Sequence, residues 1–548
     1  MDEVGIVLAM LLAVVASGYL VRILPFAVPL PLVQIALGAA ISGTTSHGVR
    51  LEPHIFFLLF LPPLLFLDGW RIPKVGLFRD RSTILELALG LVLFTVIGAG
   101  FLIHWLIPSL PLAVSFALAA ILAPTDPVAV SSIAARVPIP PRLMHILEGE
   151  SLLNDASGLV CFRFAVAAAL TGTFSPGEAT LTFLWVALAG LAIGVGLTVA
   201  VSAAQRILAA RIGEESGSPI LVNLLLPFGA YLAAEHVAAS GILAAVAAGI
   251  TMSYVELSGR ALATTRVRRA VVWDTVQFAL NGIMFVLLGE QLPAIVKAAL
   301  GAPELPAAHD VWWLLGNALA ISVGLILLRF IWVWVSLRLT LLAARRQQQA
   351  VYRPNPRLIL ATSLAGVRGA ITLAGVLTLP LAMPNGTPFP GRDLAIFLAS
   401  AVIVVSLVLA SVGLPRVLRG LELPAEPAHE SEEDRARHAA ALAALEAIAA
   451  APPPPPTAGC DLEGAAEMHA SAADQVRSLY QYRLDGGTGA GIDPHQARAA
   501  ESAERHYRLA ALEQERAVLL RMARHNQLSD EIARKLLREI DLVEARYR

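Results

Sequence analysis

Long apolar segments recur along the first three quarters of this 548-residue chain, and their length restricts its fold more than any other feature. A stretch of about 17–25 mainly apolar residues is long enough to cross the hydrocarbon layer of a membrane as an α-helix. The sequence therefore predicts an all-α polytopic membrane protein with about 13 transmembrane helices, at residues 4–23, 27–42, 54–70, 82–105, 110–132, 147–170, 180–203, 218–236, 238–254, 272–289, 311–337, 357–381 and 393–415.

The composition agrees with a chain that faces lipid. Hydrophobic residues make up 56% and charged residues 15%, against about a quarter charged in soluble domains. A net charge of -1 argues against nucleic acid as a partner. Cys161 and Cys460 are far apart, so neither a disulfide framework nor a cysteine metal site is expected. Acidic Asp2 and Glu3 precede the first apolar segment, which we interpret as a retained span rather than a signal peptide.

Basic residues alternate between successive loops. The connections after the third, fifth, seventh, ninth and eleventh segments carry most of them, whereas the intervening loops from residue 106 onward carry only Lys297 and Arg392. Because cytoplasmic loops are enriched in Lys and Arg, this pattern predicts an outside N-terminus and a cytoplasmic C-terminus.

Three parts of the chain are expected. Residues 1–420 form the transmembrane domain, 421–493 a linker with the low-complexity run Pro452–Pro456, and 494–548 a helical cytoplasmic tail. Within the tail, Ser529 followed by Asp530 indicates a helix start, and hence a helical pair. A solvated tail and a specific regulatory module both remain open.

The segment 110–132 contains two prolines that flank an acid. Pro124 and Pro127 enclose Thr125 and Asp126, and each proline removes a backbone donor and clashes with the preceding turn. We expect a broken helix rather than a kinked one. Broken helices occur at membrane depth where the freed backbone groups line a cavity or are buried in protein.

The segment 147–170 opens with a polar stripe. Glu150 and Asn154 lie one turn apart on a helix, as do Ser151 and Asp155. Asp155 lies several residues inside the apolar segment, where its carboxylate cannot stay charged without a partner. A proton and a cation would therefore compete for its oxygens. The alternative is a structural aspartate paired with an arginine.

Two arginines interrupt later apolar segments. Arg329 lies within 311–337, and Arg368 lies within 357–381 in the sequence GVRG, where the adjacent glycines favour unwinding. If the first six and last six segments are inverted repeats, the two broken segments occupy matching positions, which is typical of a transporter binding site. Asp126 and Arg368 would then compensate the charges of helix ends that cross.

The sequence resembles the monovalent cation:proton antiporter-1 family over roughly residues 5–420. The resemblance rests on three motifs in order, which are APTDPVAV, EGESLLNDASGLV and SLAGVRGAITLAG. It implies a bacterial inner-membrane homodimer that works by elevator-like alternating access in contact with lipid. It also implies that Asp155 is the ion and proton carrier, with Asn154 as its neutral partner, and that exchange is electroneutral.

The resemblance assigns further roles. It makes Ser151, Thr125 and Asp68 candidate ligands of a Na⁺ bound at Asp155, and it pairs Glu150 with Arg329. Asp126 and Arg368 match the family residues that compensate the crossed half-helices. Arg163 and Glu290 lie outside the family pattern, and their roles are left open.

The expected function is therefore exchange of Na⁺, Li⁺ or K⁺ for H⁺ by a secondary active antiporter, not an enzyme, that needs no cofactor. Two alternatives remain, a proton-coupled carrier of an organic solute and a membrane sensor that no longer transports. A solute carrier would need a larger site, and a sensor would have no reason to keep Asp155. The ion that is selected, the pH dependence and the physiological direction of transport are not predicted.

Overall fold

The structure is a computed structural model of the chain. It describes residues 3–24, 28–43, 53–72, 84–126, 130, 141–172, 176–212, 217–257, 263–301, 311–346, 356–419, 427–451, 470–478, 480–481, 494–525 and 530–544. Within these ranges the named elements are all helices, which confirms the all-α prediction. The chain divides into two compact units, Met1–Leu421 and Glu422–Arg548.

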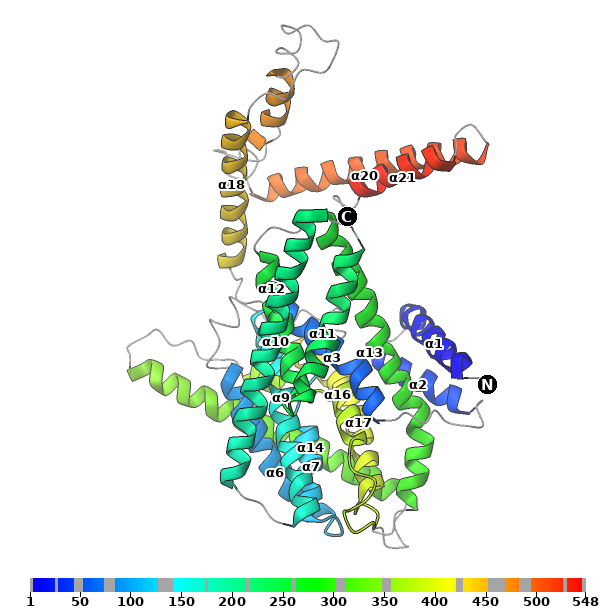
Figure 1. Ribbon diagram of the computed structural model, residues 1–548, viewed down its shortest axis with the longest axis vertical. Helices are drawn as coiled ribbons and strands as arrows, with labels where there is room; N and C mark the ends of the chain where they lie inside the picture. Colours follow the sequence, from blue (N-terminus) through cyan, green and yellow to red (C-terminus); the bar gives the residue numbers. More distant parts are fainter. Residues whose placement is uncertain are drawn as a thin grey trace. The chain divides into compact units, whose positions relative to one another are not determined.

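The first unit is a bundle of apolar helices (Figure 1). Among the described residues, eight helices are long and apolar enough to cross a membrane, and shorter apolar helices accompany them. The number of spans, thirteen, therefore stays a prediction. The helices are α1 (Glu3–Ile23), α2 (Leu30–Ser42), α3 (Pro53–Arg71), η1 (Glu86–Leu91), α6 (Val92–Leu106), α7 (Leu112–Leu122), α9 (Pro141–Thr171), α10 (Pro176–Ile212), α11 (Ser218–His236), α12 (Gly241–Leu257), α13 (Ala263–Leu300), α14 (Val311–Arg346), α15 (Pro356–Leu364), α16 (Ala370–Leu377) and α17 (Arg392–Leu418).

Several helices extend past the segments that hydropathy marks. The segment predicted at 272–289 belongs to α13, which runs from Ala263 to Leu300. Its first turns hold three arginines, which lower the local hydropathy without interrupting the helix. Hydropathy therefore locates the membrane-compatible part of a helix, while the ends depend on backbone hydrogen bonds.

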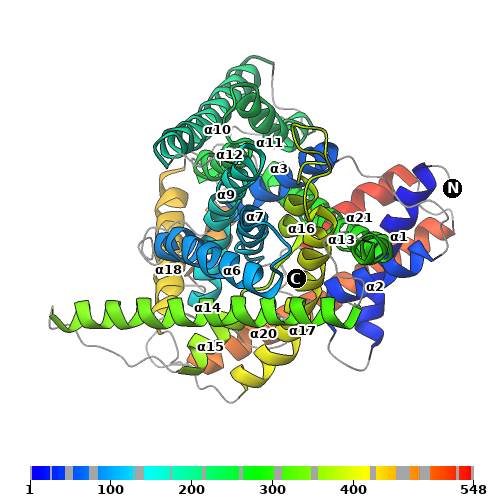
Figure 2. The ribbon, with the colours of Figure 1, turned by 90° about the horizontal axis from the view of Figure 1, so that it is seen from below.

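These helices pack in two groups, each of which makes most of its contacts internally. We call α1, α2, α3 and α10–α13 the continuous group, because each is one unbroken helix. We call η1, α6, α7, α9 and α14–α17 the interrupted group, because it contains both broken segments. In Figure 2, α10–α12 lie along one edge and α1, α2 and α13 along another, with α7, α9 and α16 between them.

The continuous group brings helix backbones together at glycines. A Cβ added at Gly38 of α2 would overlap the Val286 carbonyl of α13, and one at Gly289 of α13 would overlap the Ile35 carbonyl of α2. Gly249 of α12 meets the backbone of α3 in the same way, at Phe66. Small residues permit this close approach, and it increases the van der Waals contact between the helices. Such contact is important within lipid, because the hydrophobic effect does not drive helices together there.

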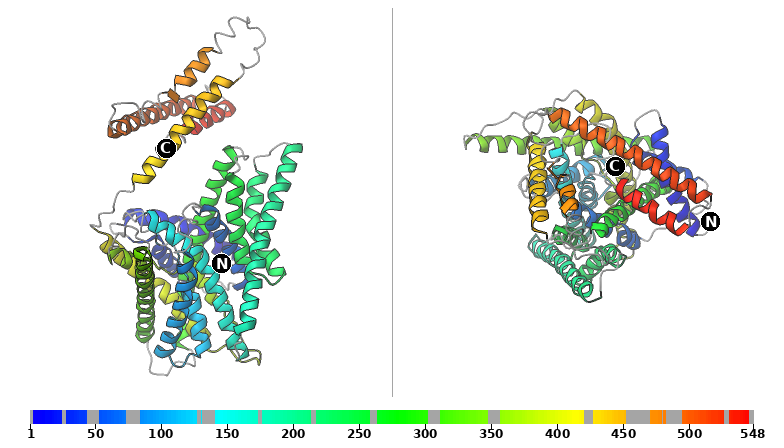
Figure 3. Two further views of the ribbon diagram at one scale, coloured as in Figure 1. Left: turned by 90° about the vertical axis from the view of Figure 1, so that its left-hand side faces the viewer. Right: turned by 90° about the horizontal axis from the view of Figure 1, so that it is seen from above.

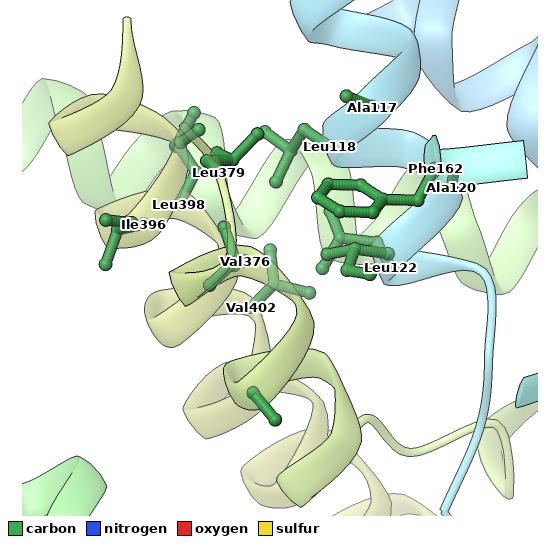
Figure 4. Packing of buried hydrophobic residues seen from close by; sticks show 14 of the residues in the cluster. Ala117, Leu118, Ala120, Leu122, Phe162, Val376, Leu379, Ile396, Leu398 and Val402 are labelled. Atoms are coloured by element: carbon green, nitrogen blue, oxygen red, sulfur yellow. The ribbon is translucent and has the colours of Figure 1, made fainter. Parts of the chain in front are cut away.

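The interrupted group has a core of aliphatic and aromatic side chains (Figure 4). Leu118 and Leu122 of α7 pack in one cluster with Phe162 of α9 and with Val376 and Val402 of α16 and α17. All of these are under 9% exposed. This packing joins the end of α7 that precedes its break to the end of α16 that lies away from the break at residues 365–369.

The second unit contains α18 (Pro427–Ala450), α20 (Pro494–Arg524) and α21 (Asp530–Glu544). The last two pack against each other, as the red and orange helices in Figure 3 show. Arg516 of α20 donates to Asp541 at 2.9 Å and pairs with Glu544 of α21. Two tail helices are thus present where the sequence predicts a helical pair, although Ser529 lies outside the described residues.

Candidate functional site

The two broken segments meet at their breaks. After α7 ends at Leu122, residues through Asp126 are not helical, and residues 365–369 separate α15 from α16. The Asp126 backbone N–H donates to the Val367 carbonyl at 2.8 Å, which joins the two breaks directly. This geometry confirms the interruption predicted for the segment 357–381. It agrees with a break after α7, while residues 127–129 and 131–140, where the rest of that segment lies, are outside the described residues.

Arg368 lies buried at this crossing. Its Nε donates to the Leu122 carbonyl at the end of α7 at 2.9 Å, and its Nη1 donates to the Gly366 carbonyl. Carbonyls at a helix end have no partner in the helix and carry partial negative charge. The positive charge of Arg368 therefore lies where the breaks leave backbone carbonyls free to accept hydrogen bonds. Gly369 follows it, and a Cβ there would overlap the Asp126 side chain.

Helix α9 carries the polar stripe and is fixed to both neighbouring elements. Ser151 Oγ donates to the Thr125 carbonyl in the break at 2.8 Å. Ser157 Oγ donates to the Ala88 carbonyl of η1 at 2.7 Å. Because η1 is a π-helical segment, its widened turn offers carbonyls to a neighbouring helix, and such turns are frequent at functional sites. These two bonds set the height and rotation of α9 around Asp155.

Glu150 and Arg329 form a bidentate ion pair. Arg329 Nη1 and Nη2 lie 2.5 and 2.6 Å from the two Glu150 carboxylate oxygens, and Nε donates to the Thr362 carbonyl at 2.9 Å. Both side chains are at most 3% exposed. The fork geometry satisfies both oxygens, which is the condition under which a buried pair can be tolerated. Glu150 is therefore already neutralised by its partner.

Asn154 links this pair to the break. Its Nδ2 donates to Thr125 Oγ1 at 3.1 Å. The same Nδ2 lies 3.5 Å from Glu150 Oε1. Its Oδ1 is buried without a hydrogen-bond partner among the described residues. Asn154 does not line the pocket described next. In this conformation it orders Thr125 rather than facing the pocket.

A small pocket opens beside Asp155. Its volume is about 30 Å³, and a water molecule needs roughly 10–15 Å³ of such space. Four sequence candidates line it together, namely Asp155, Ser151, Thr125 and Asp68, and so does Asp126. Asp155 is 3% exposed, and within the described part of the chain no hydrogen bond or ion pair reaches its carboxylate. The pocket thus combines carboxylate, hydroxyl and carbonyl oxygens, which are ligands for hard cations.

Both helix groups contribute to the pocket wall. The interrupted group supplies the α7 break, α9 and α16, and the continuous group supplies α3 and α13. From α13 come Gln277 and Asn281, which the sequence analysis did not single out, and from α16 comes Thr372. A signal for two of them was present, because Asp274, Gln277 and Asn281 recur at helical spacing in an apolar segment.

The two residues outside the family pattern lie away from the pocket. Arg163 is exposed on α9, and its Nη2 lies 3.3 Å from Glu235 Oε1 at the end of α11. Glu290 is 2% exposed on α13. Neither lines the pocket.

Comparison with known proteins gives concordant results. A family model described as "Sodium/hydrogen exchanger, transmembrane" matches residues 8–420. The chain is 40% identical over 541 residues to "Uncharacterized Na(+)/H(+) exchanger YjcE" of Escherichia coli (strain K12), covering 98% of each chain. It is 43% identical over 417 residues to "Sodium, potassium, lithium and rubidium/H(+) antiporter" of Bacillus pumilus (strain SAFR-032), covering 75% of this chain and 61% of that relative.

A solved structure has a similar fold. The sodium proton antiporter MjNhaP1 from Methanocaldococcus jannaschii, determined at pH 8, superposes with a TM-score of 0.57 at 19% sequence identity. The match covers 76% of this chain and 99% of that chain. At this identity the likeness concerns the helical architecture alone.

Proposed function

Because this chain belongs to the sodium/hydrogen exchanger family, whose named members are cation/proton antiporters, we propose that it exchanges Na⁺ for H⁺ as a secondary active transporter. The family makes it a multi-pass membrane protein and a transporter rather than an enzyme. Li⁺ and K⁺ are further candidate substrates, since the Bacillus pumilus relative is named for both.

The observation that carries the proposal is the buried Asp155 carboxylate in a pocket of about 30 Å³. A charged carboxylate at this depth requires a cation or a proton. The two ions therefore bind in alternation at the same oxygens, with Ser151, Thr125 and Asp68 as additional ligands of the cation. Asn154 is neutral and adds no charge, and the exchange is one cation for one proton.

The size of the pocket disfavours the organic-solute alternative. About 30 Å³ holds roughly two water-sized species by the measure above, whereas sites for drug-sized molecules enclose about 300–1,000 Å³. A monovalent cation with little residual hydration is compatible with this space. The non-transporting sensor is disfavoured by the assembled site itself, since Asp155 and Arg368 are costly to bury without a function.

The pocket between the two helix groups favours an elevator-type movement. The interrupted group would carry Asp155 past the continuous group, so that the pocket opens alternately to each side of the membrane. The continuous group would stay fixed and form the contact of a homodimer surrounded by lipid. We further propose a bacterial inner-membrane location with the N-terminus outside and the C-terminus in the cytoplasm.

The experiment is Na⁺-driven dissipation of a pH gradient in vesicles that contain the purified protein. Asp155→Asn should abolish exchange, lowering the rate by about 100-fold or more because its amide cannot carry the proton. Asp155→Glu should retain partial activity. Asp393→Asn is the matched control, because Asp393 is exposed at the start of α17 and should leave exchange unchanged. Normal exchange by Asp155→Asn would refute the proposed site.

Two additions define the substrate and the stoichiometry. A panel of Na⁺, Li⁺ and K⁺ in the same vesicles measures selectivity, which oxygen ligands alone do not fix. Clamping the membrane potential at different values should leave the rate unchanged if exchange is electroneutral. A rate that follows the potential would contradict one-for-one exchange while leaving the role of Asp155 intact.

A further inference from the structure

Gln277 occupies an unusual place among the polar residues of the pocket wall. It faces the pocket from α13, in the continuous group, opposite the interrupted group that carries Asp155. Asn281 lies one turn further along α13 and lines the same pocket. A second helix of the continuous group, α3, contributes Asp68 to this wall.

The amide of Gln277 is held by Arg71. Arg71 Nη1 donates to Gln277 Oε1 at 2.7 Å, and Nη2 of the same guanidinium pairs with Asp274, one turn earlier on α13. Arg71 itself lies one turn after Asp68 on α3. One planar fork therefore joins α3 to α13 at two points beside the pocket.

The chemistry of arginine fixes the orientation of the Gln277 amide. A guanidinium has donors and no acceptor, so the oxygen of Gln277 must face Arg71. The NH₂ group is consequently directed away from Arg71. With its oxygen engaged, the group that Gln277 can offer to the pocket is an N–H donor rather than a cation ligand.

A donor on this wall has a defined effect on cation binding. Asp68, Asp126 and Asp155 line the same pocket, and an N–H donor stabilises a carboxylate whose cation has left. It also repels an entering cation. Both effects weaken cation binding and ease release, which a transporter needs because a cation that is bound too tightly does not leave.

We propose that Arg71 and Gln277 form a positioning pair that lowers the affinity of the pocket for its monovalent cation. Arg71 fixes the amide, and Gln277 presents the donor to the acidic wall. This inference rests on the proposed exchange function and adds to it the residues of the continuous group that set the apparent affinity.

The test measures KM and the maximal rate for Na⁺ in vesicles at alkaline pH, where competition by protons is weakest. Gln277→Met keeps a similar volume without a donor, and it should lower the KM for Na⁺ about two- to tenfold. Arg71→Gln should give a similar decrease, because the freed Gln277 amide can rotate its oxygen into the pocket. Arg71→Lys retains a donor to that oxygen and should stay within about twofold of the wild type.

Coupling between the two positions distinguishes a positioning pair from a loss of structure. The double variant Arg71→Gln/Gln277→Met should lower KM no further than Gln277→Met alone, since residues that act through one contact are not additive. Glu256→Gln is the control, because it weakens the pairing of Glu256 with Arg269 of α13, neither of which lines the pocket. It should lower the thermal stability and leave KM unchanged.

The outcomes separate this inference from the proposed function. A wild-type protein that exchanges no cation refutes both. Exchange by the wild type together with an unchanged or raised KM in Gln277→Met overturns the positioning pair alone. If Gln277→Met does not fold, a wild-type KM in the folded Arg71→Gln variant overturns it equally.

Discussion

The interrupted and the continuous helix groups solve the same problem, helix association in lipid, with different chemistry. The interrupted group buries the Glu150–Arg329 ion pair and Arg368 around its two breaks. The continuous group brings unbroken helices into backbone contact at glycines such as Gly38 and Gly289. The fully buried charges around the breaks thus belong to the interrupted group, and the closest backbone approaches between helices to the continuous group, which also holds a partly buried pair of its own, Arg269 with Glu256. The pocket lies where the two groups meet.

The largest effect on stability is expected from Arg329→Ala. Removing the guanidinium leaves the Glu150 carboxylate buried without its partner, so the free energy of unfolding should fall by about 3–5 kcal/mol. Chemical unfolding in detergent measures it. The double variant Glu150→Ala/Arg329→Ala should lose less than the sum of the two single losses, because no unpaired charge remains. A small loss in Arg329→Ala would show that the interrupted group does not depend on its ion pair.

A smaller loss is expected in the continuous group from Gly289→Ala. The added methyl group would overlap the Ile35 carbonyl of α2 and push the two helices apart. Such overpacking costs about 1–3 kcal/mol, which thermal unfolding detects. Gly196→Ala on α10 is the matched control, since a Cβ there meets nothing within 4 Å. Equal effects of the two changes would remove close approach as the basis of packing in this group.

The smallest effect on stability is expected where the two groups touch through Arg163 and Glu235. Their side chains are 52% and 36% exposed, and exposed ion pairs contribute about 0–1 kcal/mol. Glu235→Gln should therefore change the unfolding free energy little. It should alter the exchange rate if the pair breaks when the groups move, and the swap Arg163→Glu/Glu235→Arg should restore that rate. Unchanged transport in Glu235→Gln would mean that this contact does not follow the movement.

Much of the interrupted group could be predicted from the sequence. Two prolines around Asp126 and the glycines around Arg368 are strong local signals. In the described residues α7 ends just before the first signal, and residues 365–369 at the second signal interrupt the later segment. The positions of Glu150 and Asn154 follow from helical spacing, so their side chains fall on one face of α9. The roles assigned to Asp155, Asn154 and the cation ligands remain proposals, since geometry alone does not measure transport.

The pocket wall from the continuous group could not be predicted in the same way. Gln277 and Asn281 mark a polar face of α13, but only packing decides whether that face meets α3, a partner or lipid. The π-helical turn η1 could not be predicted from its own sequence either. Its Ala88 carbonyl accepts a hydrogen bond from Ser157 on α9, a residue far away in the chain. Hydropathy also did not predict where the helices end. It marks the residues that fit the membrane layer, whereas several helices continue beyond that layer.

The close contact between Gly369 and the Asp126 side chain restricts which substitutions these two positions can accept during evolution. The two residues are 243 positions apart, yet a side chain at one fills the volume required by the other. Any substitution larger than glycine at 369 removes the room for an aspartate at 126. We therefore expect these positions to vary together across relatives, with loss of the glycine tolerated only after loss of the acid.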